Sequence, residues 1–344
     1  MKLRRLTVGD TAGQARWDDF VAGCDEASFF HRAGWQGVIE RSFGHRTHYL
    51  LAEDGGRIEG VLPMAEVRSW LFGHSLVSLP FASYGGVAAR SEAAREQLLV
   101  EAQELARSLQ VQHLELRNGG QPLYGWPTND LYVAFKLPIP AVLDDRMLAI
   151  PQKRRNMVRK AAKLGLHAVP DDSVANFFPA FAANARNHGT PTLPERYFHA
   201  LKTTFGDDCS IMSIHDTASR CVSSILCFFH KGEVMAYYAG EQPEARGLAA
   251  NDLKYWEVMK WAAARGCTRF DIGRSKRGTG SFDFKKLWGF EPHPLHYQYA
   301  LTRRESIPQN NPNNPKYRML IKTWQRLPLA VANRMGPLIV RSLG

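Results

Sequence analysis

The chain has 344 residues and a net charge of +11, and 44% of its residues are apolar. This length predicts two domains of ordinary size with packed cores. No run of 18 apolar residues occurs, which argues against a transmembrane helix, and the first residues lack the apolar segment of a signal peptide. The five cysteines are odd in number and form no CxxC pair, so we expect a reducing cytoplasm and neither a disulfide framework nor a zinc knuckle.

The positive charge is concentrated in two stretches. Residues 151–165 carry six cations and no acid, and residues 306–344 carry another six and no acid. The remainder is close to neutral. We therefore expect anionic partners to bind at defined places and not over the whole surface.

The first half of the chain predicts a sheet followed by a helix. Thr47–Ala52 and Ile58–Val67 are two β-type runs that flank a turn at Asp54-Gly55-Gly56, which is typical of a hairpin. The predicted elements that follow are a strand at 76–79, a helix capped by Ser91 with an apolar stripe at Leu98, Ala102, Leu105 and Leu109, and a strand at 111–116.

The second half repeats this order of elements. We predict strands at 209–215, 223–229 and 233–240, a helix at 251–265, and a strand at 268–272. Tyr84 corresponds in this pattern to Tyr238, and Glu115 to Asp271, at a nearly constant separation. Two similar units at one period indicate an internal duplication.

The fold class that follows is α+β, with two tandem sheet–helix units and a basic helical tail. We expect an N-terminal unit at 1–148, a second unit at 149–305 that opens with a basic helix, and at 306–344 an irregular arm followed by an amphipathic tail. Prolines at 138, 140 and 151 mark the boundary between the units.

The stretch 269–290 carries the strongest candidate site. A strand at 269–272 is expected to end at Gly273, and a basic, glycine-rich loop with Arg274 and Lys276 follows it. Open α/β sheets bind ligands outside the carboxyl ends of their strands, so this loop is a candidate anion site. A solvated basic loop is the alternative.

The basic helix at 152–165 is a second candidate. Helical spacing places Arg155 and Arg159 on one face, and Asn156 with Lys160 and Lys163 on a neighbouring one. A solvated charged face is the usual meaning of such a run. Six cations without an acid favour a phosphate-bearing partner over that meaning.

The tail leaves two alternatives open. Residues 306–315 should form an irregular arm, because they hold three prolines and four asparagines. Residues 316–344 mix apolar and basic residues in a pattern typical of an amphipathic segment on an anionic membrane surface. The same pattern would allow the tail to pack an apolar face on the body of the protein.

The order of elements resembles the GNAT acyltransferase fold, and a duplicated copy with a basic helix resembles the FemAB family of aminoacyltransferases. KRRNMVRKAAKLG at 153–165 is similar to that family's "RRNI-KA-K-G" helix, and Phe284-Lys285-Lys286 with Gly289-Phe290 is similar to its "FK…GF" segment. The segments GTGSFDFKKLWGFEP and NPNNPKY are most similar to FemAB-like proteins associated with PEP-CTERM/exosortase systems, which are linked to exopolysaccharide.

The resemblance implies N-acyl transfer, in which an amine attacks an activated carbonyl without a covalent enzyme intermediate. It implies Lys285 beside the reacting carbonyl, where a cation stabilises the oxyanion. Either Asp271 or Tyr238 would handle the proton, and a structural role suits both equally well. The substrate-binding candidates are Lys286, Arg274, Lys276, Lys153, Arg155, Asn156, Arg159 and Tyr84.

The resemblance also bears on the acyl donor, and no permanently bound cofactor is expected. Acyl-CoA enzymes with the GNAT fold hold a pyrophosphate on a Q/R-x-x-G-x-G/A loop ahead of a helix. Arg246, Gly247 and Ala249 lie in the corresponding segment, but Glu244 stands where a basic or amide residue is expected. The long helical arm of some family members is missing, which argues against aminoacyl-tRNA as donor.

Three functions remain as hypotheses. The first is N-acyl transfer to a phosphate-bearing or saccharide precursor of the cell envelope or exopolysaccharide, in the cytoplasm or at the inner face of the membrane. The second is acyl-CoA-dependent N-acetylation of a small molecule. The third is a non-catalytic basic protein that binds RNA or an acidic polymer. His45 with His48, and His293 with His296, are spaced at i, i+3, but Pro294 interrupts the second pair, and we expect no metal site.

Overall fold

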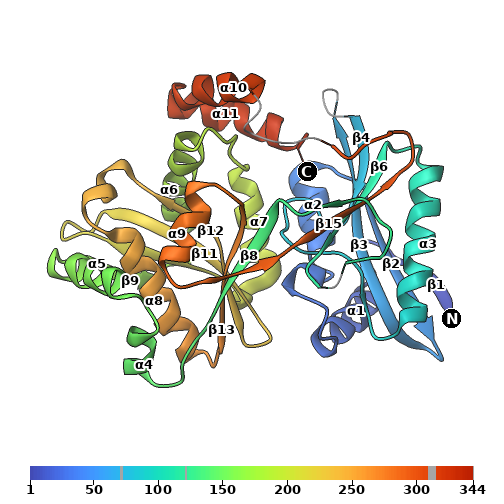
Figure 1. The fold of residues 1–344 in the computed structure, drawn as a ribbon, viewed down its shortest axis with the longest axis horizontal. Coiled ribbons are helices and arrows are strands. Elements are labelled where there is room, and N and C mark those ends of the chain that lie inside the picture. Colours follow the sequence, from blue (N-terminus) through green and yellow to red (C-terminus); the bar gives the residue numbers. More distant parts are fainter. Residues whose placement is uncertain (70–72, 121, 309–314, 344) are drawn as a thin grey trace. The chain divides into compact units, whose positions relative to one another are not determined.

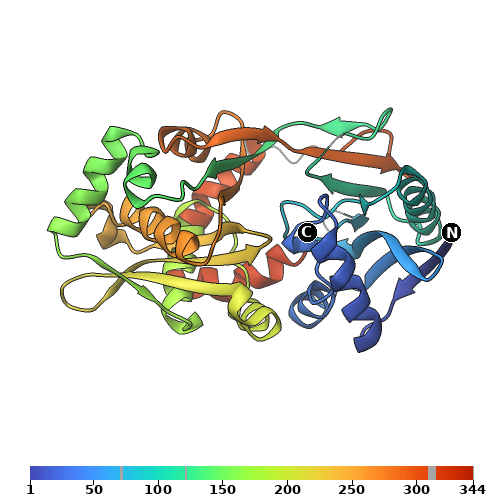
Figure 2. The same ribbon diagram turned by 90° about the horizontal axis from the view of Figure 1, so that it is seen from below.

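The computed structural model describes residues 1–69, 73–120, 122–308 and 315–343, with their side chains except at 143, 144, 246 and 315–318. The chain forms two compact units. Unit 1 contains Met1–Tyr132, Pro294–Asn310 and Arg341–Gly344, and unit 2 contains Val133–His293 and Asn311–Val340. Each unit has its own sheet (Figures 1 and 2).

The sheet of unit 1 has the order β1-β2-β3-β4-β6-β15-β7, and β5 also pairs with β3. Strands β4 and β6 run parallel, while the pairs β1–β2, β2–β3, β3–β4 and β6–β15 are antiparallel. The bounds are β1 Lys2–Leu6, β2 Thr47–Asp54, β3 Arg57–Ser69, β4 Gly73–Val77, β5 Ala88–Ala89, β6 His113–Asn118, β7 Thr128–Asn129 and β15 His296–Leu301.

Helices cover both faces of the unit 1 sheet (Figure 1). They are α1 Thr11–Gly23, the short 3-10 helix η1 Phe29–His31, α2 Trp35–Phe43 and α3 Glu92–Ser108. Ser91 caps α3 as predicted, because its side chain accepts from the backbone N–H of Ala94. The predicted stripe is confirmed in Leu98, Ala102 and Leu105, which pack on Leu50, Leu62, Leu76 and Leu114 of the sheet.

The sheet of unit 2 has the order β14-β8-β13-β12-β11-β10-β9. Its bounds are β8 Tyr132–Pro138, β9 His167–Pro170, β10 Cys209–His215, β11 Cys221–His230, β12 Glu233–Glu241, β13 Arg269–Lys276 and β14 Glu291–Pro294. Strands β12 and β13 are parallel, which requires the crossover helix α8 between them.

The helices of unit 2 lie on both faces of this sheet. Helix α8 packs on β10, β11 and β12 from one face and carries α5 on its outer side, whereas α6 and α7 pack on the other face (Figures 1 and 2). The bounds are α4 Leu143–Leu148, α5 Gln152–Lys163, α6 Val174–Asn187, α7 Glu195–Phe205, η2 Gly206–Asp208, η3 Pro243–Gly247, α8 Ala250–Ala264, α9 Gly280–Leu287, α10 Pro315–Gln325 and α11 Leu329–Val340.

The tail packs on unit 2 through one of its faces. Ala332 and Gly336 of α11 are buried, and Gly336 lies so close to Thr192 that an added Cβ would come within 2.8 Å of the Thr192 backbone nitrogen. Gln325 of α10 donates to the carbonyl of Asn187 at 2.9 Å. The expected arm at 306–315 falls largely on residues outside the described chain.

One expectation about the stretch 269–290 is wrong. The strand does not end at Gly273 but continues as β13 to Lys276, with Gly273 at φ +72° inside it. The loop that follows is therefore reduced to residues 277–279. The segment with Lys285 and Lys286 forms the helix α9, and the Thr279 side chain caps it by accepting from the N–H of Phe282.

The units divide the chain at places other than the expected boundaries of 148/149 and 305/306. Strand β8 lies beside β13 in the sheet of unit 2, although it precedes the basic helix. Strand β15 follows unit 2 in sequence but pairs with β6 of unit 1 over six residues. Each sheet therefore contains a strand that lies beyond the expected boundary.

We predict that Gly240→Ala destabilises the protein by about 2 kcal/mol or more. Gly240 of β12 faces α6, and a Cβ built on it would overlap the backbone of Ala180 and Phe181. A backbone segment inside a packed helix cannot move aside as a side chain can. Urea unfolding of the full chain measures the change.

The matched control is Gly247→Ala, where an added Cβ meets nothing within 4 Å. Its free energy of unfolding should stay within about 0.5 kcal/mol of the wild-type value. Equal stability of the two variants would contradict the close contact between α6 and β12.

Candidate active site

The sheet of unit 2 opens between its two parallel strands. In the described chain, β12 and β13 pair only where Glu233–Met235 lies beside Arg269–Asp271. Strand β12 continues to Glu241 and β13 to Lys276, so their carboxyl ends separate. Helix α8 begins at this same edge, because it connects the end of β12 to the start of β13. Ligands of α/β sheets bind at such an edge.

A β-bulge at Tyr237 shapes one side of this opening. Tyr238 lies opposite Leu226, and Ala236 lies opposite the next residue, Cys227, so Tyr237 is the extra residue of the bulge. The extra residue turns the side chain of Tyr238 toward α6 and α7. The opposite face then receives Ala236 and Ala239, which pack in the α8 core.

Tyr238 is buried against an aromatic cluster of α6 and α7. Its hydroxyl lies 2.9 Å from that of Tyr197, and its ring meets Phe181 and Phe198 edge to face. Burial raises the pKa of Tyr238 well above its usual value. The hydroxyl is therefore protonated at neutral pH, so Tyr238 is suited to donate a proton and not to accept one.

Lys285 of α9 contacts the carboxyl-terminal part of β13. Its side chain is buried, and its ammonium donates to the carbonyls of Gly273 at 2.9 Å and Arg274 at 3.0 Å. The Phe135 ring lies 5.5 Å from the ammonium nitrogen. Burial lowers the pKa of Lys285 to about 8; Asp271 opposes this shift and Arg274 adds to it. An ammonium has three donors, and the described protein groups accept two of them.

Asp271 holds the strand beside Lys285. One carboxylate oxygen accepts from the backbone N–H of Gly273 at 2.6 Å, and the other lies 3.8 Å from the ammonium of Lys136. The side chain is only 1% exposed. This arrangement stabilises the positive φ of Gly273 and favours a structural role over proton transfer.

Two further predicted cations lie on the same strand. Arg274 and Lys276 alternate with the buried Ser275, so both point to one side of β13 just past the pairing with β12. Burial and Arg274 lower the pKa of Lys276 to about 8. Lys286 differs from them, because its side chain is exposed on α9.

The basic helix α5 contains two kinds of cation. Arg154 is largely buried and donates to the Asp252 carboxylate of α8 at 3.2 Å. Lys153, Asn156 and Arg159 are exposed and Arg155 is half-buried. No acid pairs with Lys153, Arg155 or Arg159 among the residues that the structure describes.

The start of α8 meets the expected acyl-CoA loop in part. Gly247 ends the 3-10 helix η3, and Ala249 precedes α8 with φ +57°. The first backbone N–H that α8 satisfies internally is that of Leu253, so earlier N–H groups face the opening edge. The side chain of Arg246 lies outside the description.

Asp252 and Lys254 give this helix end a charge pattern that the sequence analysis missed. Asp252 is buried in the first turn, where burial raises its pKa against the effect of Arg154. Lys254 is 1% exposed and donates to Ser223 at 2.9 Å and Asn251 at 2.5 Å. Burial lowers the pKa of Lys254 to about 8, although Glu241 opposes the shift.

One signal for Lys254 was present in the sequence. Ala250, Lys254, Val258 and Ala262 form an i, i+4 row in which the three apolar members are fully buried. A lysine that interrupts an apolar row is a buried cation and has a partner inside the core. The partner of Arg154 had no comparable signal, because it lies 98 residues away.

Tyr84 is not the structural counterpart of Tyr238. The parallel pairing places Val77 beside Glu115 in unit 1 and Met235 beside Asp271 in unit 2. Tyr238 therefore lies inside β12, whereas Tyr84 lies in the segment after β4. Tyr84 is buried with its ring 5.8 Å from that of Phe30.

Residues 152–286 match the sequence model of the family described as "Acetyltransferase (GNAT) domain". This match confirms the prediction of an acyltransferase for this part of the chain. The comparison with curated proteins returned no match.

Three solved structures are similar in fold. FemX has a TM-score of 0.64 and 14% identity over 93% of this chain and 100% of that chain. L-PGS from Bacillus licheniformis has a TM-score of 0.56 and 10% identity over 94% of this chain and 100% of that chain. A tandem GNAT protein from the clavulanic acid biosynthesis pathway has a TM-score of 0.54 and 14% identity over 89% of this chain and 99% of that chain. The predicted α+β fold of tandem GNAT-like units is confirmed.

We predict that Arg154→Gln destabilises the protein at pH 7 by about 3 kcal/mol, because it leaves the buried Asp252 carboxylate without its cation. The loss should be smaller near pH 4, where the carboxyl group of the variant takes up a proton. Chemical denaturation at the two pH values measures this difference.

Arg159→Gln is the matched control on the same helix. Its free energy of unfolding should stay within about 0.5 kcal/mol of the wild type. The double variant Arg154→Gln, Asp252→Asn should recover much of the stability. Equal effects of Arg154→Gln and Arg159→Gln would show that the ion pair contributes nothing.

Proposed function

We propose that the protein is an N-acyltransferase whose reaction takes place at the opening between β12 and β13. The observation that carries this proposal is the geometry of Lys285. Two backbone carbonyls orient its ammonium, and the third donor has no protein acceptor in the described chain. A preoriented donor in a partly dry site is the usual means of stabilising the oxyanion of acyl transfer.

In this reaction the nitrogen of the acceptor amine attacks the donor carbonyl. A C–N bond forms, and electrons move to the carbonyl oxygen, where Lys285 stabilises the charge. The bond to the leaving group then breaks, and the attacking amine loses a proton. Tyr238 carries its proton at neutral pH and supplies it to the leaving group, and the proton that the amine loses returns to the Tyr238 phenolate, which restores the enzyme.

The acceptor that we propose is a phosphate-bearing or saccharide precursor of the cell envelope or exopolysaccharide. Arg274 and Lys276 would contact its phosphate, with Arg155 and Arg159 of α5 as further cations. The sequence likeness to FemAB-like proteins of PEP-CTERM/exosortase systems supports this class of acceptor. The family match at 152–286 supports catalysis over a non-catalytic basic protein.

The acyl donor that the fold favours is an acyl-CoA. Gly247 is exposed in open space, and the unsatisfied N–H groups of α8 follow it, as a pyrophosphate site requires. Glu244 is exposed and acidic at the position where a cation or amide is expected. Aminoacyl-tRNA is the alternative donor, and the basic helix α5 is the feature that supports it.

We propose that the tail holds the enzyme at the inner face of an anionic membrane. None of the described helices is both long and apolar enough to span a bilayer. The side of the tail away from unit 2 exposes Met319, Leu320, Met335 and Leu338, the last at 74%. Exposed Lys322, Arg326 and Arg334 accompany them, with no acid in 306–344. This composition suits binding to anionic lipid.

Lys285→Met tests the catalytic proposal. We expect kcat to fall about a hundredfold, equivalent to about 3 kcal/mol of transition-state stabilisation. Some stability should also be lost, because the carbonyls of Gly273 and Arg274 lose a donor. In the wild type, kcat should decline above about pH 8 as Lys285 loses its proton, and this decline should be absent from Lys285→Met.

Lys286→Met is the matched control, because Lys286 is the adjacent residue but is exposed. It should leave kcat unchanged and act at most on KM. A folded Lys285→Met variant that keeps full kcat would refute the catalytic role, and so would a Lys286→Met variant with the same rate loss.

Met319→Ser combined with Leu338→Ser tests the tail. Both residues are exposed, at 71% and 74%, so the fold should tolerate the change. The wild type should float with vesicles of phosphatidylglycerol and phosphatidylcholine, and the double variant should remain in the dense fraction. Leu148→Ser with Leu287→Ser replaces two exposed leucines outside the tail and should float. If the wild type never floats, the membrane proposal is wrong and the tail serves only to pack on unit 2.

A further inference from the structure

Unit 1 contains a polar cavity that the proposed function does not use. Its volume is about 580 Å³, within the usual range for small-molecule sites. It lies where β3 and β4 meet the turn between α3 and β6. The lining residues are Arg68, His74, Leu109, Gln110, Gln112 and Arg303.

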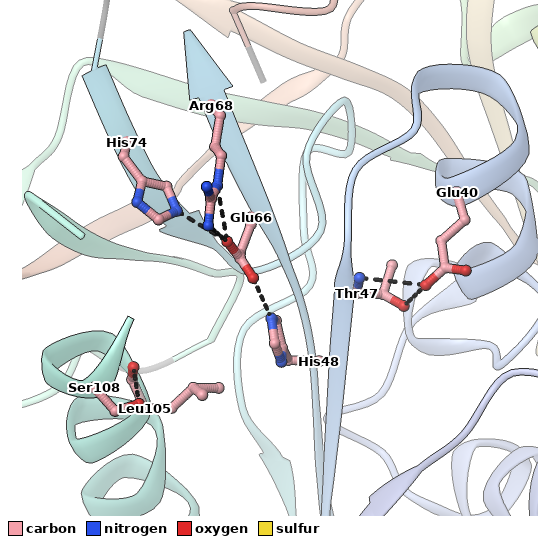
Figure 3. A network of polar contacts seen from close by, with 8 residues as sticks. All are labelled: Glu40, Thr47, His48, Glu66, Arg68, His74, Leu105 and Ser108. Carbon is pink, nitrogen blue, oxygen red and sulfur yellow. Dashed lines mark hydrogen bonds and ion pairs between the residues drawn. The ribbon is translucent and has the colours of Figure 1, made fainter. Parts of the chain in front are cut away.

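Two of the lining residues, Arg68 and His74, contact the buried carboxylate of Glu66 (Figure 3). One of its oxygens lies 2.8 Å from Nε2 of His48. The other accepts from Arg68, at 3.2 Å from Nε and 2.9 Å from Nη2, and lies 3.0 Å from Nε2 of His74. Burial alone would raise the pKa of Glu66, but the hydrogen bonds from His48, Arg68 and His74 lower it to about 2.

This network lies where helix α3 no longer covers the face of β3. Leu62 and Met64 of β3 pack under α3, and Glu66 and Arg68 continue the same face. Helix α3 ends at Ser108, so the face beyond it lies open. The last carbonyls of α3 are used locally, since Leu105 accepts from both Ser108 and Leu109. Few carbonyl oxygens at the end of α3 are therefore left without a hydrogen bond, so they would repel an anion only weakly.

Glu66 holds the side chains of Arg68 and His74 in place, and its own carboxylate is buried. Arg68 and His74 lie directly opposite each other on β3 and β4, and the carboxylate between them fixes both side chains. The side chain of Arg68 remains 71% exposed, whereas Glu66 is 3% exposed. The guanidinium of Arg68 is therefore accessible from the cavity, whereas the carboxylate of Glu66 is not.

The remaining wall adds a second cation and an amide. Arg303 is exposed, and no acid pairs with it in the part of the chain that the structure describes. Gln112 lies against Gly73, where a Cβ would overlap its carboxamide, so the glycine makes room for this side chain. None of the six lining residues is acidic.

We propose that this cavity binds a small phosphate monoester that carries hydroxyl groups. Two guanidinium groups suit the oxygens of a phosphate dianion, because each can donate two parallel hydrogen bonds. The volume exceeds that of one phosphate, and the amides of Gln110 and Gln112 suit hydroxyl groups beside it. The cavity lies in unit 1 and shares no residue with the transfer site of unit 2.

The test is isothermal titration calorimetry of the full chain with glucose 6-phosphate, and with glucose as the neutral probe. Glucose 6-phosphate should bind, and glucose should not. Arg303→Gln should weaken the binding about tenfold or more, because it removes one of two guanidinium contacts. Arg303 makes no ion pair in the described chain, so the variant should fold, which thermal melting checks.

Arg57→Gln is the matched control. Arg57 is an exposed arginine at the opposite end of β3, and its loss should not change the affinity. Arg274→Gln serves as a second arm, because unit 2 carries cations of its own. The proposal is overturned if glucose 6-phosphate fails to bind, or if Arg303→Gln binds it as tightly as the wild type. Loss of binding in Arg274→Gln alone would assign the phosphate to unit 2 and also overturn the proposal.

Discussion

The hydrogen bonds from Lys285 to two successive carbonyls of β13 are the constraint on which the unit 2 site depends. A buried ammonium is costly unless acceptors replace its water. Successive carbonyls of a regular strand point in opposite directions, so a single donor reaches both only where the backbone turns. Gly273 provides that turn with φ +72°, and Asp271 holds it through the Gly273 N–H. The position of Lys285 on α9 therefore depends on the turn in β13, and the buried ammonium depends on the two carbonyls that this turn presents.

The sequence predicted the elements whose signals are local. The hairpin of β2 and β3, the Ser91 cap and the individual strands and helices of each repeat follow from short local patterns. The bulge at Tyr237 could not be predicted, because it is a property of the β11–β12 register and not of any residue type. The glycine at 273 was interpreted as a strand end, since positive φ usually marks a turn. In β13 it lies inside a strand.

Charge composition had the same limitation. The six cations of residues 151–165 predicted a basic helix, and α5 forms there. The sequence could not separate Arg154, which serves the fold by holding Asp252, from Arg155 and Arg159, which have no acidic partner in the described residues. This division depends on a contact with α8 across the packed interface. A count of charges in the sequence therefore overestimates the cations available to a substrate, because some of them, such as Arg154, form ion pairs inside the fold.

The duplication explains why chemistry is expected in one unit. Both sheets have a central parallel pair, with Glu115 of β6 in the place of Asp271 of β13. Two residues further, unit 2 has Gly273, but unit 1 has Arg117. Its backbone N–H binds Ser78 Oγ at 2.7 Å and its guanidinium donates to the Ala82 carbonyl at 2.9 Å. These bonds keep β4 and β6 joined past Val77, where β12 and β13 separate. A buried arginine therefore joins the two strands in unit 1, and a glycine stands at the same place in unit 2, which supports our proposal that acyl transfer takes place beside Lys285.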